Sequence, residues 1–299
     1  MELKRVVVTG LGAITPVGNN IQSTWDNLLK GVSGAAPIKG FDASQFKTQF
    51  ACEIKDFAAA DFIDRKELRK MDLYEQYALV AAMEAVKDSG MDLETIDKDN
   101  IGVVLGVGIG GIHTFEEQIG EYARTHEEKG PRFSPFFIPK MIADIASGRI
   151  SIQYGFHGPN YTTTSACASS TNAIADAFNL IRLGKANVMV TGGAEAAISP
   201  GGLGGFNAMH ALSTRNDDPT RASRPFSASR DGFVMGEGAG ILILEELEHA
   251  KARGAKIYCE LAGAGMSADA HHLTASHPEG LGASLVMQRA LQDAELNPE

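Results

Sequence analysis

Short apolar runs that end in glycine are the feature that most restricts the fold of this chain. Residues 6–8 lead into Thr-Gly-Leu-Gly, residues 101–105 lead into a glycine-rich turn, and residues 187–191 end at Gly192. Runs that are apolar on both faces predict strands buried between helices, and the segments between them carry apolar residues at helical spacing. The sequence therefore predicts an α/β fold with a mostly parallel sheet that is covered on both faces.

Cys167 lies where one predicted strand turns into a helix. Residues 161–165 are rich in β-branched and aromatic side chains, and apolar residues recur at helical spacing from Ile174 until Gly184 supplies a stop. The unpaired N–H groups and the dipole at a helix start stabilise a thiolate, which is the form of cysteine that attacks carbon. Cys167 is therefore a candidate nucleophile that forms a thioester. On this stretch alone, a small buried hydrophobic residue is the alternative interpretation.

Composition argues against several classes of partner. The 27 basic and 37 acidic side chains give a net charge of -10, which argues against nucleic acid and an anionic membrane surface as main partners. No apolar run approaches the ~20 residues of a membrane span. The three cysteines, Cys52, Cys167 and Cys259, are far apart, so they offer no metal-ligand or disulfide spacing. We therefore expect a cytoplasmic protein without a metal site.

Two glycine-rich segments and one phenylalanine-rich segment are predicted to be loops. Residues 106–111 formally match the dinucleotide-binding pattern, but Pro-Arg-Phe-Ser-Pro replaces the acidic residue expected about 20 positions later, which disfavours that function. These glycines are instead predicted to let the backbone pass close to a substrate or a second chain. Residues 131–139 are expected to form an ordered hydrophobic loop over a pocket or an interface, and residues 201–206 a flexible one.

The end of the chain resembles its beginning. Residues 258–265 repeat the pattern of an apolar strand followed by Gly-x-Gly, and residues 285–294 resemble residues 79–88. In the first copy a buried strand follows at residues 101–105, whereas the second copy stops at Glu299 before any such strand. This pattern predicts a duplicated α/β fold whose second half has only begun, and it indicates a fragment.

Five motifs together resemble the β-ketoacyl-acyl carrier protein synthases, most closely the type II enzymes of dissociated fatty-acid synthesis. The resemblance covers the whole chain, and it favours the nucleophile as the role of Cys167. The motifs are Thr163-Thr164-Ser165-Ala166-Cys167-Ala168-Ser169, Gly192-Gly193-Ala194-Glu195, Leu212-Ser213-Thr214-Arg215-Asn216, Arg224-Pro225-Phe226 and Asp231-Gly232-Phe233-Val234-Met235-Gly236-Glu237-Gly238-Ala239-Gly240.

The resemblance implies the thiolase-like fold, in which two similar halves form five α-β-α-β-α layers, and it implies a homodimer. Residues 1–256 would then form the amino-terminal half with the nucleophilic cysteine. Residues 257–299 would form the incomplete start of the carboxy-terminal half.

The resemblance also implies the chemistry. The cysteine accepts an acyl chain from acyl carrier protein, malonyl carrier protein loses carbon dioxide, and the resulting carbanion attacks the thioester in a Claisen condensation. No dissociable cofactor is needed, and the N–H of Cys167 would form half of the oxyanion hole. The catalytic histidines of the family lie downstream of Glu299, and none of the eight histidines of this chain matches their motifs. Condensation by this chain alone is therefore expected to fail.

The resemblance assigns further roles residue by residue. Ile109 matches the gate of the acyl pocket, Phe206 matches a pocket wall, and Phe137 matches a residue that reaches the partner's pocket across the dimer. Simple core packing is the alternative for these three. Thr274 matches the mouth of the pantetheine channel, and His210 stands where relatives often have arginine.

Lys66, Arg69 and Lys70 have a spacing that places them on one predicted helical face. From the residues alone, a solvated face is the simpler interpretation. The resemblance instead matches them to the basic patch that docks the acidic carrier protein. Two rival functions are a polyketide or type I ketosynthase, and a non-catalytic partner that dimerises or binds carrier protein.

Overall fold

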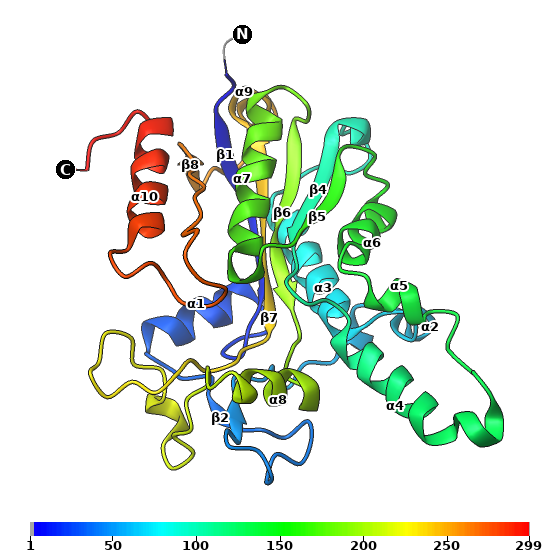
Figure 1. Cartoon of the computed structure of the whole chain (residues 1–299). Coiled ribbons are helices and arrows are strands. Elements are labelled where there is room, and N and C mark those ends of the chain that lie inside the picture. Colours follow the sequence, from blue (N-terminus) through cyan, green and yellow to red (C-terminus); the bar gives the residue numbers. More distant parts are fainter. Residues whose placement is uncertain (1–2, 299) are drawn as a thin grey trace.

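The computed structural model describes residues 3–298, and its centre is a six-stranded mixed sheet with helices on both faces (Figure 1). The order of the strands is β5-β4-β6-β7-β1-β8. Their bounds are Val6–Ile14 for β1, Ile101–Gly106 for β4, Asn160–Thr163 for β5, Val188–Glu195 for β6, Gly238–Glu246 for β7 and Cys259–Leu261 for β8.

The prediction of a mostly parallel sheet is correct for only part of the sheet. β4 pairs in parallel with both β5 and β6, but β7 is antiparallel to β6 and β1, and β8 is antiparallel to β1. The central strands are apolar on both faces whatever their direction, so an apolar run does not reveal which way a strand points.

Two hydrophobic clusters cover the two faces of the sheet. On one face, α3 (Leu73–Asp88) and α6 (Ile145–Tyr154) pack against Val103 and Leu105 of β4. On the other face, α7 (Ser169–Arg182) packs against Val104 of the same strand. The alternation of adjacent β4 residues between the clusters is what a strand buried on both sides requires. In Figure 1, α7 lies in front of the sheet and α3 lies behind it.

The remaining elements surround this core. Residues 201–206, predicted to be flexible, lie inside helix α8 (Pro200–Ala208), because Ser199 caps the start of this helix and glycine allows close packing there. Residues 137–139, predicted to be a loop, lie in helix α5 (Phe137–Met141), since Pro139 falls in the first turn, where a proline is tolerated. The other elements are α1 (Ile21–Leu29), β2 (Ala36–Pro37), β3 (Phe50–Ala51), α2 (Arg65–Leu68), α4 (Ile112–Lys129), α5 (Phe137–Met141), α8 (Pro200–Ala208), α9 (Leu247–Ala252), α10 (Leu281–Asp293) and short 3-10 turns at Ala59–Asp61, Lys98–Asn100, Ala166–Ala168 and Pro219–Arg221. Within residues 3–298, no helix combines the length and apolar character needed to cross a membrane.

The predicted internal repeat has a structural counterpart at its glycines. A Cβ atom on Gly12 would lie 2.0 Å from the Ala81 carbonyl oxygen of α3, and one on Gly265 would lie 2.3 Å from the Val286 carbonyl oxygen of α10. In both copies, glycine therefore lets the strand segment approach the helix backbone directly.

The same repeat also shares a hydrogen bond. The N–H of Leu11, between two glycines, donates to the Asp88 carboxylate at 2.9 Å, and the N–H of Ala264 donates to the Asp293 carboxylate at 2.9 Å. Asp88 thus corresponds to Asp293 in the structure. The match of residues 79–88 with 285–294, which pairs Asp88 with Ala294, is therefore shifted by one position. The division into halves at residue 256 stays a prediction, because β8 extends the first sheet.

Candidate functional site

Cys167 lies in the 3-10 turn that leads directly into α7, at the carboxyl ends of β4 and β6. Two glycines permit this position. A Cβ atom on Gly106 would lie 2.2 Å from the Ser169 backbone, and one on Gly193 would lie 2.0 Å from the Ser170 hydroxyl. The start of α7 therefore packs directly on the backbone of these two glycines, and Cys167 is exposed beside the carboxyl ends of the two strands, at the start of the helix that its sequence context predicts.

The turn before the cysteine is held by side-chain hydrogen bonds. Ala166 has φ of +50°, a conformation that residues other than glycine rarely adopt. The Ser169 hydroxyl accepts the Ser165 N–H at 2.9 Å and donates to the Ala166 carbonyl at 2.7 Å, and the Asn172 amide donates to the Ser165 hydroxyl at 2.7 Å. These bonds fix Cys167, which is exposed and not paired in a disulfide.

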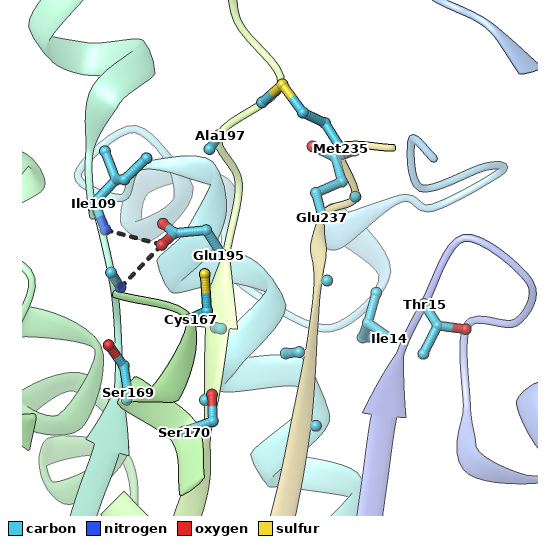
Figure 2. Close-up of a pocket in the computed structure, with 18 of the residues that line it drawn as sticks. Ile14, Thr15, Ile109, Cys167, Ser169, Ser170, Glu195, Ala197, Met235 and Glu237 are labelled. Atoms are coloured by element: carbon cyan, nitrogen blue, oxygen red, sulfur yellow. Dashed lines mark hydrogen bonds between the residues drawn. The ribbon is translucent and has the colours of Figure 1, made fainter. Parts of the chain in front are cut away.

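The exposed thiol opens on a cavity of about 690 Å³ (Figure 2). The cavity brings Cys167 together with Ile109 and Phe206, two of the residues predicted to shape an acyl pocket. Most of the surrounding groups are small or apolar, so the cavity suits an apolar chain attached to the sulfur. Other lining residues include Ile14, Pro16, Ala197, Phe233, Met235 and Ala239.

Two carboxylates also line the cavity. Glu195, the last residue of β6, accepts the N–H groups of Gly108, Ile109 and Gly110 at 2.9, 2.8 and 3.2 Å. Burial raises the pKa of Glu195, while the three N–H groups act in the opposite direction. In the sequence, Glu195 is recognisable only as the last residue of the motif Gly192-Gly193-Ala194-Glu195. Its position at the end of a buried strand is the signal that indicates a role at the site.

Glu237 is the second carboxylate of the cavity. It accepts the Ile54 N–H at 2.8 Å and the Tyr77 hydroxyl at 3.2 Å, and burial raises its pKa. All eight histidines fall within residues 3–298, and none of them lines the cavity. The same residues contain no group of three or more His, Cys, Asp or Glu side chains that could hold a metal ion.

Two predicted substrate-binding residues lie outside this cavity. Phe137 is half-buried on α5, where its ring stacks on Phe133 with centroids 5.5 Å apart and lies 6.4 Å from the ring of Phe115. Thr274 is exposed in the loop between β8 and α10, and its N–H donates to His272 Nδ1 at 3.2 Å. Their roles across a dimer and at a pantetheine channel stay predictions.

The three predicted docking residues do not share one helical face. Helix α2 has only four residues and ends at Leu68, so Arg69 and Lys70 lie beyond it. The helix is short because Asp72 already caps the start of α3. Lys66 and Arg69 are exposed, whereas the Lys70 ammonium bonds to the Glu67 carboxylate at 2.6 Å. The three positive charges are close in sequence, but the charge of Lys70 is partly neutralised by Glu67.

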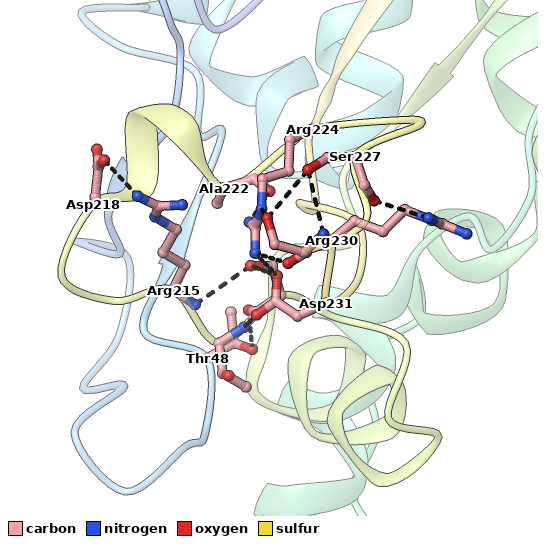
Figure 3. A network of polar contacts seen from close by, with 11 residues as sticks. Thr48, Arg215, Asp218, Ala222, Arg224, Ser227, Arg230 and Asp231 are labelled. Carbon is pink, nitrogen blue, oxygen red and sulfur yellow. Dashed lines mark hydrogen bonds and ion pairs between the residues drawn. The ribbon is translucent and has the colours of Figure 1, made fainter.

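A polar network holds the long segment between α8 and β7 beside the cavity (Figure 3). The Asp231 carboxylate accepts the Ser213 hydroxyl at 2.7 Å and the Thr214 N–H at 3.0 Å, and it pairs with Arg224 at 3.1 Å. The bond from Ser213, supported by Arg224, lowers the pKa of Asp231. His210 lies nearby and lines a second cavity of about 420 Å³ with Arg224. The network positions the following residues, which include Phe233 of the main cavity.

Comparison with known proteins shows the family of this chain. The sequence model described as "Beta-ketoacyl synthase, N-terminal domain" matches residues 3–250. The chain belongs to the β-ketoacyl synthase family. It is 52% identical over 300 residues to a protein of Synechocystis sp. named 3-oxoacyl-[acyl-carrier-protein] synthase 2, covering all of this chain and 71% of that protein.

Other members of the β-ketoacyl synthase family are also similar. A Staphylococcus aureus protein with the same name is 50% identical over 297 residues, covering 99% of this chain and 70% of that protein. A solved β-ketoacyl synthase of Burkholderia phymatum superposes with a TM-score of 0.88 at 34% identity, covering 98% of this chain and 71% of the other. A type II polyketide ketosynthase solved with its acyl carrier protein has a TM-score of 0.89 at 33% identity, over 99% and 71% of the two chains. These relatives place the chain in the predicted thiolase-like fold.

Proposed function

We propose that this protein is a 3-oxoacyl-[acyl-carrier-protein] synthase II, an acyltransferase that elongates fatty acids. The observation that carries the proposal is the exposed Cys167 at a helix start, facing an apolar cavity of about 690 Å³. The relatives named 3-oxoacyl-[acyl-carrier-protein] synthase 2 support it, because they are more similar in sequence than the solved polyketide ketosynthase. A polyketide-type ketosynthase is therefore the less favoured function.

Acyl transfer is the step that the described residues support. The Cys167 thiolate attacks the carbonyl carbon of the acyl thioester on the carrier protein, and a new carbon–sulfur bond forms. The bond to the carrier's pantetheine sulfur breaks, and that sulfur takes up the proton that the cysteine released. The backbone N–H of Cys167 would stabilise the developing oxyanion together with the positive end of the α7 dipole, and the apolar cavity would receive the acyl chain.

Condensation needs groups that polarise the carbonyl of the malonyl thioester. Since no histidine in the part of the chain that the structure describes lines the cavity, we assign only acyl transfer to residues 3–298. In the complete reaction, malonyl carrier protein would lose carbon dioxide, and its carbanion would attack the Cys167 thioester and release the thiolate. No dissociable cofactor takes part in these steps.

The proposed partners are acyl carrier protein, in its acyl and malonyl forms, and a second copy of this chain. A ketosynthase relative has been solved with its carrier protein. The proposed dimer surface includes Phe115 and Ile138, which are 46% and 52% exposed beside Phe137. We propose the cytoplasm as the location, because all three cysteines are free.

The test of acyl transfer is Cys167→Ala, with Cys259→Ala as the matched control. Both cysteines are exposed, but Cys259 lies in β8, away from the cavity. Incubation with radiolabelled acyl carrier protein should label the wild type and Cys259→Ala, whereas Cys167→Ala should remain unlabelled and folded. A labelled Cys167→Ala protein would show that another residue is the nucleophile.

The test of carrier docking is charge reversal at Lys66 and Arg69, with Lys70→Glu measured separately. Reversal of the two exposed charges should slow association with the acidic carrier protein, and added salt should reduce the difference. Lys70→Glu should have a smaller effect because Glu67 already pairs with Lys70. Equal association rates for the wild type and the double variant at low salt would show that these residues form an ordinary solvated surface.

A further inference from the structure

The segment 107–111 borders the cavity through Gly108 and Ile109. It consists of Ile109, three glycines and Val107, and Ile109 is 44% exposed and lines the cavity. At one end, the Val107 N–H donates to the Thr163 carbonyl at 3.2 Å, and at the other end the Gly111 N–H donates to the Met141 carbonyl at 3.2 Å. The two ends are therefore tied to β5 and α5.

The middle of this segment is held by one side chain. The Glu195 carboxylate accepts the three successive N–H groups of residues 108–110, two through Oε2 and one through Oε1. Figure 2 draws the two bonds to Oε2. Bonds from N–H groups to a carboxylate are stronger than bonds between neutral groups. The glycines on both sides of Ile109, one with φ of +81° at Gly110, give the backbone freedom once these bonds are lost.

The backbone of Glu195 is fixed in the sheet, and its carboxylate bonds to residues outside the sheet. Its backbone belongs to β6 and pairs with Gly238 of β7, and its carboxylate extends from the end of this strand to the backbone of residues 108–110. Gly108 approaches it so closely that a Cβ atom would lie 2.8 Å from Oε2. The carboxylate thus fills a space that the glycine leaves open.

We propose that Glu195 is a positioning residue that holds the backbone of residues 108–110 and thereby sets how far Ile109 enters the acyl cavity. This inference rests on the proposed acyl transfer. Without the three bonds, Ile109 moves away from the cavity and longer acyl chains enter more easily. Glu195 consequently determines chain-length discrimination without touching the reacting carbon.

The experiment compares Glu195→Gln and Glu195→Ala with Glu53→Gln. The control is matched, because the Glu53 carboxylate also accepts two backbone N–H groups, from Lys39 at 2.8 Å and Gly40 at 2.9 Å, but does not line the cavity. The first readout is amide hydrogen exchange. Residues 108–110 should exchange about tenfold faster in both Glu195 variants, while residues 188–194 of β6 should keep their protection.

The second readout is transfer to Cys167 from hexanoyl and myristoyl carrier proteins. The ratio of myristoyl to hexanoyl kcat/KM should rise about fivefold or more in the Glu195 variants, mainly through KM, and stay unchanged in Glu53→Gln. Gly108→Ala, which forces a methyl group against Oε2, should reproduce this change with Glu195 intact.

The outcomes separate the two proposals. Unchanged exchange at residues 108–110 in a folded Glu195→Ala protein would overturn the positioning role, and so would faster exchange with an unchanged chain-length ratio. If the wild type is not acylated at Cys167, the proposed function fails, and hydrogen exchange still decides whether Glu195 holds the segment. If the β6 amides exchange faster in Glu195→Ala, that variant is destabilised as a whole. The positioning role is then judged from Glu195→Gln and Gly108→Ala.

Discussion

The two strand–glycine–helix units of this chain have the same internal contacts but very different surroundings. In the first unit, α3 packs on the sheet and ten of its residues are buried, whereas in the second unit, α10 buries only Gly282 among the described residues. The glycine contacts and the bonds to Asp88 and Asp293 are nevertheless equivalent. The contacts within each unit therefore follow from its local sequence, whereas the burial of its helix depends on the strands that pack against that helix.

Gly12→Ala and Gly265→Ala should give the largest contrast. The new methyl group would lie 2.0 Å from a backbone oxygen of α3 in the first variant and 2.3 Å from one of α10 in the second. We expect Gly12→Ala to lower the free energy of unfolding by about 3 kcal/mol, because the surrounding core cannot move. Gly265→Ala should displace α10 and leave the main unfolding transition within about 0.5 kcal/mol of wild type.

Chemical denaturation combined with hydrogen exchange in α10 measures both effects. Gly148→Ala in α6 is the control, because a Cβ atom there meets nothing within 4 Å and alanine favours helix. Equal losses of stability for Gly12→Ala and Gly265→Ala would mean that both units belong to one cooperative core.

Asp88→Ala and Asp293→Ala should give a smaller contrast of the same kind. Asp88 accepts the Leu11 N–H and the Tyr258 hydroxyl, so its loss should cost about 1–2 kcal/mol in global unfolding. Asp293 accepts the Ala264 N–H and Arg182 of α7, and its loss should speed exchange in α10 without changing the global transition. A global loss in Asp293→Ala would contradict this division.

Low pH should weaken the attachment of α10, because it protonates the Asp293 carboxylate that holds this helix. Although burial acts to raise it, the bonds from Arg182 and the Ala264 N–H lower the pKa of Asp293 below its ordinary value of 3.8. The stabilisation is therefore complete above that value and is lost as pH falls through the lower folded pKa. Exchange in α10 should rise below about pH 4 in wild type, whereas Asp293→Asn should remove this pH dependence.

Arg5→Gln should have the smallest effect. Arg5 of the segment before β1 bonds to Glu260 of β8, but its side chain is 64% exposed. Solvent and salt screen such a pair, so the midpoint of thermal unfolding should not change measurably. A decrease as large as that of Asp88→Ala would show that β8 is part of the cooperative core.

Elements with a regular local pattern of apolar residues could be predicted from the sequence. Strand lengths and strand directions that depend on contacts with distant residues could not. The position of Cys167 could be predicted, because strand and helix patterns meet there. The real length of β1, from Val6–Ile14, could not, since Thr-Gly-Leu-Gly has the composition of a loop and becomes strand only because its glycines pack on α3. Antiparallel β7 was missed because an apolar run has no direction.

Within the site, the same limit applies. Ile109 and Phe206 were predicted by resemblance and do line the cavity, whereas Phe137 and Thr274 lie outside it. The bonds of Glu195 to residues 108–110 join groups about 86 positions apart, and no local pattern in the sequence encodes such a contact. The shortness of α2 was missed because a regular spacing of basic residues suggested a longer helix.

The edge of β1 has a consequence for the behaviour of the protein at high concentration. Among residues 3–298, β8 pairs with Val6, Val7 and Val8 of β1, and the rest of this edge has no strand partner. Its N–H groups at Leu11 and Ala13 are instead taken by carboxylates of α3, Asp88 and Glu84, at 2.9 Å each. These two N–H groups are therefore not available to a foreign strand, which disfavours intermolecular β-sheet growth from this edge.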